Sequence, residues 1–437
     1  MGKIIKRYYI NAKIRMETPL AISNGEKEYT DSDVLKNSQG KIFIPGTALA
    51  GAFRNFLDCK KTKKCSFGYS SKNKDGSSEI DEGSMSSVFI SDVYFDDTTV
   101  SVRDGVSLNE NKTVENKFDY EIIEAGKTSE LKIERIVRED DDDRDNALNE
   151  TAQILYGLNS GDIRLGSKKN RGFGWIKVTD VYLYEFDKNN VSEWIEYCKK
   201  GAVSDEKNRW DDWKNDTYQT GKYFSIKIPL RLQGGISIRK YSTKPNEADY
   251  EHITAKGEDG ERLPVIPGTS WNGAIRAGIK DILRALGISE TDTKIKSWFG
   301  YVDKVNDKAH QSNIIIKESV LRGSTMLPIS RNRVNRFDAS TVDGALYSEI
   351  SYFGGETELE ILVRNLSKDN DFDDYASVAL MGAVILAIEE ICQGYIAIGG
   401  QTAVGRGIFE KNGEIQYGGN ISREDCLKEL ALLKDRR

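Results

Sequence analysis

The sequence predicts an α+β protein in which one structural unit is written twice. FIPGTALAGAFRNFL, at residues 43–57, returns as VIPGTSWNGAIRAGI at residues 265–279. Two further stretches recur later in each half, in the same order. An internal repeat of this kind decides the fold class, because each copy must form the same supersecondary unit. We therefore expect two tandem domains with one architecture.

The other recurring stretches also agree residue by residue. One set of residues in the first half recurs in the second half without a gap. In order, the pairs are Arg103 and Arg331, Val106 and Val334, Thr113 and Thr341, Val114 and Val342, Glu121 and Glu349, Ile122 and Ile350, Gly126 and Gly354, Glu130 and Glu358, Leu131 and Leu359, and Ile133 and Ile361. A glycine-rich loop then follows, GSKKNRGFGWIKV from Gly166 and GGQTAVGRGIFE from Gly399. Collinear matches along both halves make chance a poor explanation.

Each half shows the same order of predicted elements. Alternating polarity predicts strands, and apolar residues at helical spacing predict helices. In the first half the predicted strands cover residues 5–16, 86–95 and 171–186, the predicted helices cover residues 47–57 and 146–158, and a predicted hairpin over residues 118–136 turns at Ala125 and Gly126. The second half repeats this order at residues 224–232, 269–286, 312–321, 346–365, 378–394 and 406–410. Strand, helix, strand, given twice, is the order of a ferredoxin-like or RNA-recognition-type domain.

The length of the chain suits this division. A chain of 437 residues exceeds one ordinary core and is long enough for two domains. We expect a first domain at residues 1–187, a linker at residues 188–221, a second domain at residues 222–437 and a tail helix from Ser422. No apolar run approaches the roughly 20 residues that cross a bilayer, so we expect a cytoplasmic protein without a membrane partner.

The composition excludes several classes of site. The five cysteines contain no CxxC pair, so neither a disulfide framework nor a structural zinc site is expected. The only histidines, His252 and His310, argue against a ribonuclease that uses a histidine pair. The net charge of -6 gives no global reason to bind nucleic acid. Nucleic-acid binding depends instead on local positive charge, which the basic segments of the chain could supply.

The helix that begins the repeated phrase permits two interpretations. Thr47 stands where an N-cap belongs, and an apolar stripe follows it, formed by Leu49, Ala52, Phe53, Phe56 and Leu57. Gly51 in mid-helix costs about 1 kcal/mol relative to alanine, which suggests that something passes close to it. The helix is either a capped core helix alone or one whose N-terminus also binds phosphate. The second interpretation assigns RNA contacts to Gly46, Thr47 and Arg54, and to their counterparts Gly268, Thr269 and Arg276.

Two basic segments favour RNA. The first glycine loop carries Lys168, Lys169 and Arg171 without an acid, and Phe173 stands between glycines where an aromatic ring could stack on a base. Its counterpart in the second half carries Arg406. The segment RGSTMLPISRNRVNR, from Arg322, is also free of acids, and a long excursion between strands is often functional. The residues assigned to RNA binding there are Arg331, Arg333 and Arg336. A basic surface turn without RNA remains the alternative for the glycine loop.

Together these stretches resemble the RAMP proteins that form the backbone of type III CRISPR-Cas effector complexes. The likeness rests on IPGT-x3-G-x2-R, on RDGVSLNENKTVENKFDYEIIEAG and on GSKKNRGFG, each with a counterpart in the other half, so it covers nearly the whole chain. It implies modified ferredoxin-like domains that stack along a CRISPR RNA, with β-hairpin thumbs that kink the guide-target duplex. The loops beginning at Arg103 and Arg331 would be these thumbs. Two such domains in one chain resemble the fused subunits of type III-D systems.

The resemblance also implies partners and a reaction. The partners are CRISPR RNA, target RNA, other RAMP backbone subunits and the large polymerase/cyclase-like CRISPR subunit. In the family an aspartate before the IPG motif cleaves target RNA, and Asp31 and Asp249 occupy the matching places, with Asp33 as a second choice in the first half. A lone carboxylate suffices if it holds a divalent metal, Mg²⁺ or Mn²⁺, or orients the 2′-hydroxyl for in-line attack. Either aspartate is alternatively a polar loop residue without chemistry.

Three functional hypotheses follow. The preferred one is an RNA-guided endoribonuclease subunit that occupies two backbone positions and cuts target RNA once per domain. The second is a structural RNA-binding subunit of the same complex with idle catalytic loops. The third is a guide-processing ribonuclease of the same superfamily, which normally needs a histidine or a compensating basic triad and therefore ranks last.

Overall fold

The computed structural model of the chain describes residues 2–23, 25, 28–57, 66–72, 80–96, 100–108, 113–141, 147–201, 207–215, 223–241, 248–257, 260–303, 308–364, 374–419 and 422–434. Contacts between residues divide the chain into two compact units. One consists of residues 1–102, 118–167 and 173–220, and the other of residues 103–117, 168–172 and 221–437. Both combine helices with mostly antiparallel sheets, so the expected α+β class is confirmed.

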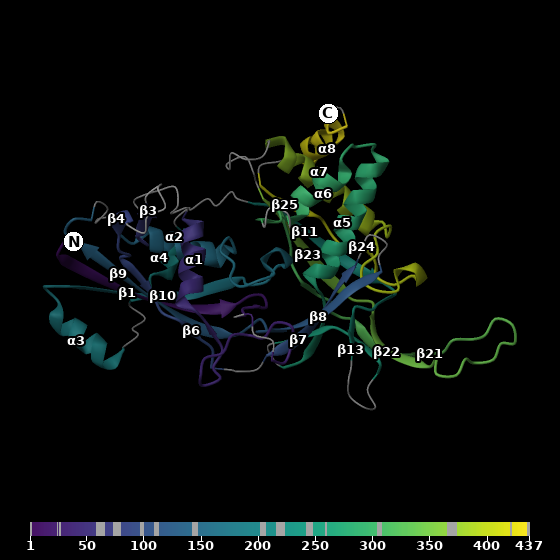
Figure 1. The fold of residues 1–437 in the computed structure, drawn as a ribbon, viewed down its shortest axis with the longest axis horizontal. Coiled ribbons are helices and arrows are strands. Elements are labelled where there is room, and N and C mark those ends of the chain that lie inside the picture. The colour runs from purple at the N-terminus through teal and green to yellow at the C-terminus, as the bar shows by residue number, and fades with distance from the viewer. Residues whose placement is uncertain are drawn as a thin grey trace. The chain divides into compact units, whose positions relative to one another are not determined.

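The elements of the first half follow the predicted order (Figure 1). They are β1 (Ile4–Met16), β2 (Phe43–Ile44), α1 (Gly46–Phe56), β3 (Tyr69–Lys72), β4 (Ile80–Ser84), β5 (Val88–Ile90), β6 (Val93–Tyr94), β7 (Ser101–Leu108), β8 (Val114–Ile122), β9 (Thr128–Arg138), α2 (Asn149–Ser160), the 3-10 helix η1 (Lys169–Arg171), β10 (Ile176–Asp187), α3 (Val191–Lys200) and α4 (Trp210–Asn215).

The main sheet of the first unit has the strand order β10-β1-β9-β5. Strand β1 lies in the middle, with Ile10 opposite Ile133 of β9 on one side and Leu183 of β10 on the other. Alternate residues of β1 are buried because side chains point to opposite faces at a period of two. Its inward face packs with Leu49 and Phe53 of α1 and with residues of α2 in one hydrophobic core.

The segment after β10 covers the other face of the same sheet. Tyr182, Tyr184 and Phe186 of β10 alternate with the residues that face the main core, and they pack against Trp194 and Tyr197 of α3. Helix α4 instead contributes Trp210 to the main core. Both helices lie in the expected linker, so that part of the chain also encloses the first unit's sheet.

The second half carries the same order with additional strands. Its elements are β11 (Tyr223–Gln233), β12 (Gly235–Ile236), β13 (Arg239–Tyr241), β14 (Tyr250–His252), β15 (Thr254–Lys256), β16 (Arg262–Ile266), α5 (Gly268–Ala285), α6 (Thr291–Phe299), β17 (Tyr301–Asp303), β18 (Lys308–His310), β19 (Ile314–Ile316), β20 (Ser319–Val320), β21 (Thr325–Arg331), β22 (Tyr347–Phe353), β23 (Glu356–Arg364), α7 (Asp374–Cys392), the 3-10 helix η4 (Thr402–Val404), β24 (Ile408–Lys411), β25 (Gln416–Gly418) and α8 (Arg423–Leu432).

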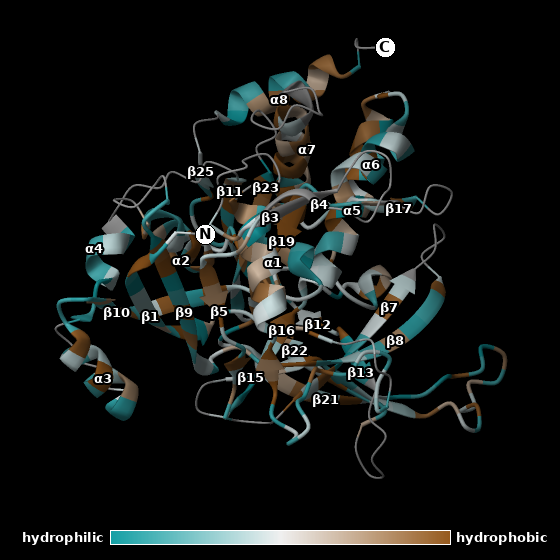
Figure 2. Cartoon of the chain, turned by 60° about the vertical axis from the view of Figure 1, so that its left-hand side comes forward, coloured by the Kyte–Doolittle hydropathy of each residue, from teal (hydrophilic) through white to brown (hydrophobic). Residues whose placement is uncertain are grey.

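The main sheet of the second unit has the order β19-β23-β11-β24, which is the order of the first sheet read from the other edge. Helices α5 and α7 pack on each other and against this sheet. Helix α7 is hydrophobic along most of its length, as Figure 2 shows, because neighbouring elements surround it. The expected tail helix is confirmed as α8, which packs on α7.

A second sheet in this unit carries a long hairpin. Strands β21 and β22 pair antiparallel from Thr325 with Phe353 to Arg331 with Tyr347. Strand β14 pairs parallel with β22 on the other side, with Tyr250 opposite Glu349. The loop between β21 and β22 extends away from the sheet (Figure 1). In the first half, β7 and β8 pair at the corresponding place, and residues 109–112 between them lie outside the described residues.

Two local predictions are wrong. Helix α1 begins at Gly46 after Pro45, so Thr47 lies inside the first turn and is not the N-cap. A proline can replace a capping side chain here because it pre-sets an extended backbone before the helix. The turn at Gly126 exists, with φ +83°, but it does not close a hairpin. Strand β8 pairs with β7 while β9 pairs with β1 and β5, so the chain passes from one sheet to another.

The two glycine loops have the same backbone. In each loop a residue with positive φ, Lys168 or Gln401, precedes a 3-10 turn that ends at a left-handed glycine. The loops then close through equivalent hydrogen bonds, from Leu165 N–H to Gly174 O at 2.9 Å and from Ile398 N–H to Gly407 O at 2.8 Å. A Cβ built on Gly174 would lie 1.9 Å from Leu165 O, so only glycine fits there.

The glycines of the repeat should therefore respond oppositely to alanine. Gly174→Ala should lower the free energy of unfolding by about 3 kcal/mol or more, because the backbone must move and φ is +78°. Gly51→Ala should raise it by up to about 1 kcal/mol, because an added Cβ meets nothing within 4 Å and alanine favours helix. Denaturant unfolding of the two variants tests this, and equal effects would contradict it.

Candidate nucleic-acid interface and cleavage site

Asp31 is held against the strand that ends the first half's hairpin. Its backbone N–H donates to Asp119 Oδ1 at 2.9 Å, and the N–H of Asp119 donates back to Asp31 Oδ2 at 3.2 Å. Both hydrogen bonds join the loop before α1 to β8. The Asp31 side chain is nonetheless exposed. The loop is therefore fixed while the carboxylate stays accessible from outside.

Asp249 is held in an equivalent way in the second half. The N–H of Ser348 donates to Asp249 Oδ2 at 2.7 Å, and the Ser348 hydroxyl also lies 3.2 Å from this oxygen. The N–H of Asp249 donates in turn to the Ser348 hydroxyl at 3.3 Å. Ser348 lies on β22 directly before Glu349, just as Asp119 lies shortly before Glu121 on β8. Both predicted aspartates are thus exposed and joined to the same strand of the repeat.

Asp33, the second choice in the first half, has a different role. Its carboxylate accepts hydrogen bonds from the N–H groups of Glu28, Tyr29 and Thr30 and from the Thr30 hydroxyl. The hydrogen bond from the Thr30 side chain, followed by those from the backbone, lowers the pKa of Asp33 to about 2. The side chain is buried and its acceptor positions are used. Asp33 therefore shapes the loop that presents Asp31.

A buried glutamate underlies each anchored aspartate. In the first half Glu121 Oε2 accepts from Val34 N–H at 2.9 Å and lies 3.6 Å from Lys36 Nζ. The N–H of Glu121 donates to Ser32 O at 3.0 Å. In the second half Glu349 is 0% exposed. Both glutamates are tied to the segments that surround the predicted catalytic loops.

Side chains from three segments contact the carboxylate of Glu349. Its carboxylate lies 3.6 Å from Arg239 Nη2 and 3.4 Å from Arg331 Nη2. Gln401 Nε2 donates at 2.8 Å to Glu349 Oε2, the oxygen that Arg239 contacts, while Arg331 lies against Oε1. Arg331 also donates to Gln401 Oε1 at 3.3 Å. These contacts join β13, the end of β21 and the second glycine loop around one carboxylate.

The first glycine loop departs from the predicted base-stacking site. Phe173 is buried and packs with Ala21, Tyr120 and Ile122, so its ring cannot stack on a base. The glycines on both sides, Gly172 and Gly174, have positive φ, so the backbone turns sharply around the ring. Lys168 and Lys169 are partly buried, and burial lowers the pKa of both, with Arg171 adding to the effect at Lys168.

The first residues of α1 and α5 are both glycines with close neighbours. The N–H of Gly46 donates to Asp92 Oδ1 at 2.7 Å, so a carboxylate already occupies the place predicted for an anion. A Cβ built on Gly268 would lie 2.3 Å from Ile316 O and 2.4 Å from Arg171 O, all within the second unit. Close backbone approach explains the glycine at Gly268, and the predicted phosphate contacts of Gly46 and Gly268 stay predictions, with the N–H of Gly46 bonded to Asp92 in this structure.

The remaining predicted residues of the two helices form an exposed stripe. Thr47, Gly51 and Arg54 of α1 lie on one helical face and are all exposed. Their counterparts are also all exposed, and they are Thr269, Gly273 and Arg276 of α5. At Gly51 and Gly273 an added Cβ would meet nothing within 4 Å. No packing within the described residues therefore explains why glycine stands there in both helices.

The loop between β21 and β22 is unusually apolar for an exposed segment. Phe337 is 92% exposed, and Leu346 is 74% exposed. Arg333 and Arg336 lie on the same loop and are exposed as well. Arg406, the predicted RNA contact in the second half's glycine loop, lies over the Phe353 ring of β22. Its guanidinium carbon is 4.6 Å from the ring centroid. Exposed aromatic and cationic side chains together are typical of surfaces that contact nucleic acid.

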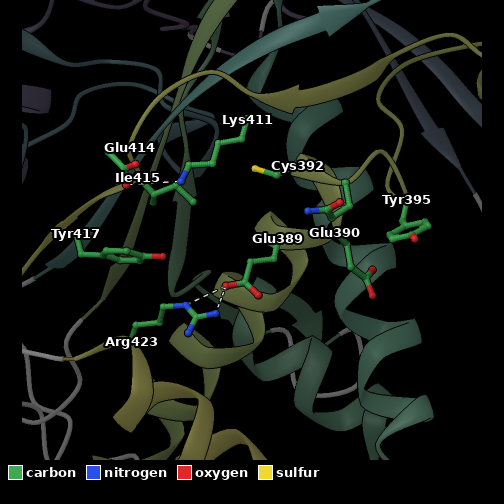
Figure 3. A pocket seen from close by; sticks show the side chains of 10 residues that line it. Glu389, Glu390, Cys392, Tyr395, Lys411, Glu414, Ile415, Tyr417 and Arg423 are labelled. Atoms are coloured by element: carbon green, nitrogen blue, oxygen red, sulfur yellow. Dashed lines mark hydrogen bonds and ion pairs between the residues drawn. The ribbon is translucent and has the colours of Figure 1, made fainter.

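A separate pocket in the second unit contains none of the predicted residues (Figure 3). It has a volume of 510 Å³ and is lined by Glu389, Glu390, Cys392, Gln393, Tyr395, Lys411, Glu414, Ile415, Tyr417 and Arg423. Glu389 and Arg423 face each other in an ion pair.

Within the described part of the chain no three His, Cys, Asp or Glu side chains are placed to hold a metal ion together. None of the described helices is long and apolar enough to cross a bilayer.

Sequence reasoning missed three features of this surface. Glu121 and Glu349 fall in register in the repeat, and that agreement at a charged position was the available signal. Arg239 carried no signal, because it lies outside the matched stretches and reaches Glu349 only through the pairing of β14 with β22. Phe337 directly follows the basic segment, which ends at Arg336, and no repeat match includes it.

The hydrogen bonds of Asp33 predict a local effect. Asp33→Asn should speed amide exchange at Glu28, Tyr29 and Thr30 by about tenfold, because charge-assisted hydrogen bonds are lost. Asp31→Asn, two residues away, should leave these amides unchanged. Hydrogen bonds from the Thr30 side chain and from the backbone depress the pKa of Asp33 from 3.8 to about 2. The protection of these amides from exchange should therefore be complete above pH 3.8 and be lost as the pH falls through about 2. Hydrogen exchange with mass spectrometry measures both, and equal exchange in the two variants would contradict the role of Asp33.

Comparison with known proteins agrees with the repeat. A family model described as the RAMP superfamily matches residues 13–177 and again residues 223–410. No curated protein sequence matches the chain. The two matched regions together cover most of the sequence and begin within β1 and at β11, the first strand of each main sheet. The resemblance seen in the sequence is thereby confirmed at the level of the superfamily, and the chain belongs to the RAMP superfamily.

Proposed function

We propose that this chain is a backbone subunit of a type III CRISPR effector complex that binds a guide-target duplex and cleaves the target RNA once per domain. Membership of the RAMP superfamily makes it a CRISPR-associated RNA-binding protein. The observation that carries the cleavage proposal is the equivalent anchoring of Asp31 and Asp249. Each is exposed, yet its loop is bound to the strand that completes a hairpin.

The tandem arrangement supports occupation of two consecutive positions on the guide. Both main sheets have the order expected of a ferredoxin-like domain, with the first and third strands adjacent in the middle. The hairpins β7–β8 and β21–β22 take the place of thumbs, and the exposed Phe337 and Leu346 suit insertion beside unstacked bases. Two domains in one chain, as in fused type III-D subunits, would set one fixed spacing between cleavage sites.

The chemistry proposed for each aspartate is modest. At a kinked nucleotide the 2′-hydroxyl already approaches the line of attack on its own phosphate, and positioning supplies much of the rate. The anchored carboxylate accepts or orients the 2′-hydroxyl proton. The 2′ oxygen forms the new bond to phosphorus while the bond to the 5′ oxygen breaks, and the leaving 5′ oxygen takes up a proton from water. The products are a 2′,3′-cyclic phosphate and a 5′-hydroxyl end.

The residues present also fit a divalent cation, Mg²⁺ or Mn²⁺. Mg²⁺ is usually held by one or two carboxylates together with water and substrate phosphates, and does not need a cage of protein ligands. Asp31 and Asp119 lie side by side in the first half and would hold it there, while Asp249 would do so alone in the second. When bound, the ion would stabilise negative charge on the reacting phosphate.

The guide backbone is proposed to follow the exposed stripes of α1 and α5. Threonine hydroxyls and arginine guanidinium groups are common phosphate ligands, and glycine permits close approach of a backbone. The arginines of the β21–β22 loop and of the glycine loops would add charge at neighbouring phosphates. Other RAMP subunits and the large polymerase/cyclase-like subunit would bind the same guide at its remaining positions.

Substitution of each aspartate tests the cleavage proposal. In the assembled complex, Asp31→Ala should remove one target cleavage product and leave the other, and Asp249→Ala should do the reverse, because each domain has its own carboxylate. The loss should be about a hundredfold or more in rate. Sequencing gels of labelled target RNA resolve the products, and guide content of the complex is the control for assembly. Normal cleavage at both places in both single variants would refute the assignment.

The same experiment separates the alternatives. Target cleavage that survives the double substitution, or no cleavage at this subunit, would make the chain a structural RNA-binding subunit. Guide processing is disfavoured by His252, which is buried between Ile238 N–H and Val265 O and whose pKa burial lowers to about 4. Cleavage of a CRISPR repeat hairpin by the purified protein alone would establish that activity.

The helix stripe predicts a specific salt dependence. Arg54→Gln should weaken RNA binding and reduce the slope of log affinity against log salt by about 1, because one phosphate contact is lost. Arg209→Gln, an exposed arginine at the start of α4, is the matched control and should leave the slope unchanged. Filter binding at several salt concentrations measures both, and equal slopes in the two variants would remove Arg54 from the interface.

A further inference from the structure

We propose that Glu349 is a positioning residue that fixes Arg239 and Arg331 as a preformed phosphate clamp beside Asp249. This inference rests on the proposed function, because the clamp would act on the RNA phosphate next to the cleavage site. It goes beyond that function in assigning a role to Arg239, which no repeat or motif indicated.

The first step is the burial of Glu349. A carboxylate with 0% exposure is stable only when partners compensate its desolvation, and here they are two guanidinium groups, one amide and the Ser351 hydroxyl at 3.3 Å. A buried ion cluster is weak evidence for a gain in stability, since apolar side chains of similar volume often do as well. Its persistence at a duplicated position therefore suggests a positional role.

The second step is the origin of the arginines. Arg239 comes from β13 and Arg331 from the end of β21, at the base of the exposed loop. The two strands are separated in the sheet by β14 and β22. Because like charges repel, two guanidinium groups on these strands are stabilised by a shared anionic acceptor. Glu349 is that acceptor, and Gln401 extends the cluster to the glycine loop.

The third step is the charge that remains. Two guanidinium groups and one carboxylate leave an excess of positive charge in the cluster. The side chains of Arg239 and Arg331 are 33% and 29% exposed, so both still reach the surface. Arg239 also stacks on Tyr250, 4.4 Å from the ring centroid. The cluster retains donor capacity for an anion.

The fourth step is the position of Asp249 in the sheet, close to Glu349. Tyr250 and Glu349 are paired across β14 and β22, and their neighbours Asp249 and Ser348 are hydrogen-bonded to each other. One strand pair therefore carries the clamp and the anchored aspartate at adjacent positions. A phosphate held by Arg239 and Arg331 would lie near the carboxylate that is proposed to act on it. In the first half Glu121 instead binds Val34 N–H, so there the same position holds the loop directly.

A double-mutant cycle in the RNA-containing complex tests the role of Glu349. Glu349→Gln should lower target cleavage at the second domain's site by about tenfold or more, because misplacing a binding group by about 1 Å is costly, and should leave the first domain's product unchanged. It should also reduce the salt slope of target binding by about 1. Arg331→Gln should do the same, and the combined variant should be no worse than either alone, because both changes disrupt one unit.

The control is Glu356→Gln. Glu356 is also a glutamate of the second domain paired to an arginine, Arg231, at 3.1 Å, but both side chains are more than half exposed. This variant should match the wild type in both readouts. Glu349→Gln complexes that match Glu356→Gln, or that lose both products equally along with guide content, would overturn the positioning role.

The outcomes also separate this inference from the proposed function. A wild-type complex without RNA would refute the proposed function and the clamp together. A wild-type complex that binds RNA without cutting would refute only the nuclease proposal, since the salt slope still reports the clamp. Additive losses in the combined variant would show that Glu349 and Arg331 act separately, which also overturns the inference.

Discussion

The antiparallel pairing of the first and third strands in each main sheet determines most of this structure. In the first unit β1 pairs with β9 over nearly its whole length, and in the second β11 pairs with β23 from Tyr223 to Arg231. The two strands of each pair are far apart in sequence, so the chain between them must leave the sheet and come back to it. The loop before the helix and the hairpin before the third strand therefore meet at one end. That meeting places Asp31 against β8 and Asp249 against β22.

Much of the fold could be predicted because local pattern and global packing agree in it. The alternation of β1, the apolar stripe of α1 and the duplicated phrase all report which residues face a core, and burial of Leu49 and Phe53 follows directly. The hairpin predicted at Gly126 is wrong although a glycine between two strands usually closes a hairpin. Pairing partners are decided by distant strands, and nothing local distinguishes a hairpin from a crossing between sheets.

The candidate site was partly visible for a related reason. Asp31 and Asp249 could be located by their place before a recognisable phrase, although their hydrogen-bond partners could not. Phe173 shows what composition cannot predict. In sequence, an aromatic residue in a basic glycine loop suits RNA stacking as well as it suits a core, and only the direction of the backbone places its ring in the core. Arg239 reaches its partner through strand pairing and so had no sequence signal at all.

The two anchors of the repeat differ in chemistry, Asp119 in one half and Ser348 in the other. In an assembly of identical subunits a substitution alters every copy at once, so no position can change alone. Joining two copies in one chain removes that symmetry. One copy can carry an additional negative charge beside its aspartate while the other carries a neutral hydroxyl. Two copies in one chain can thus diverge independently, while the peptide chain keeps them in a fixed order and a ratio of one to one.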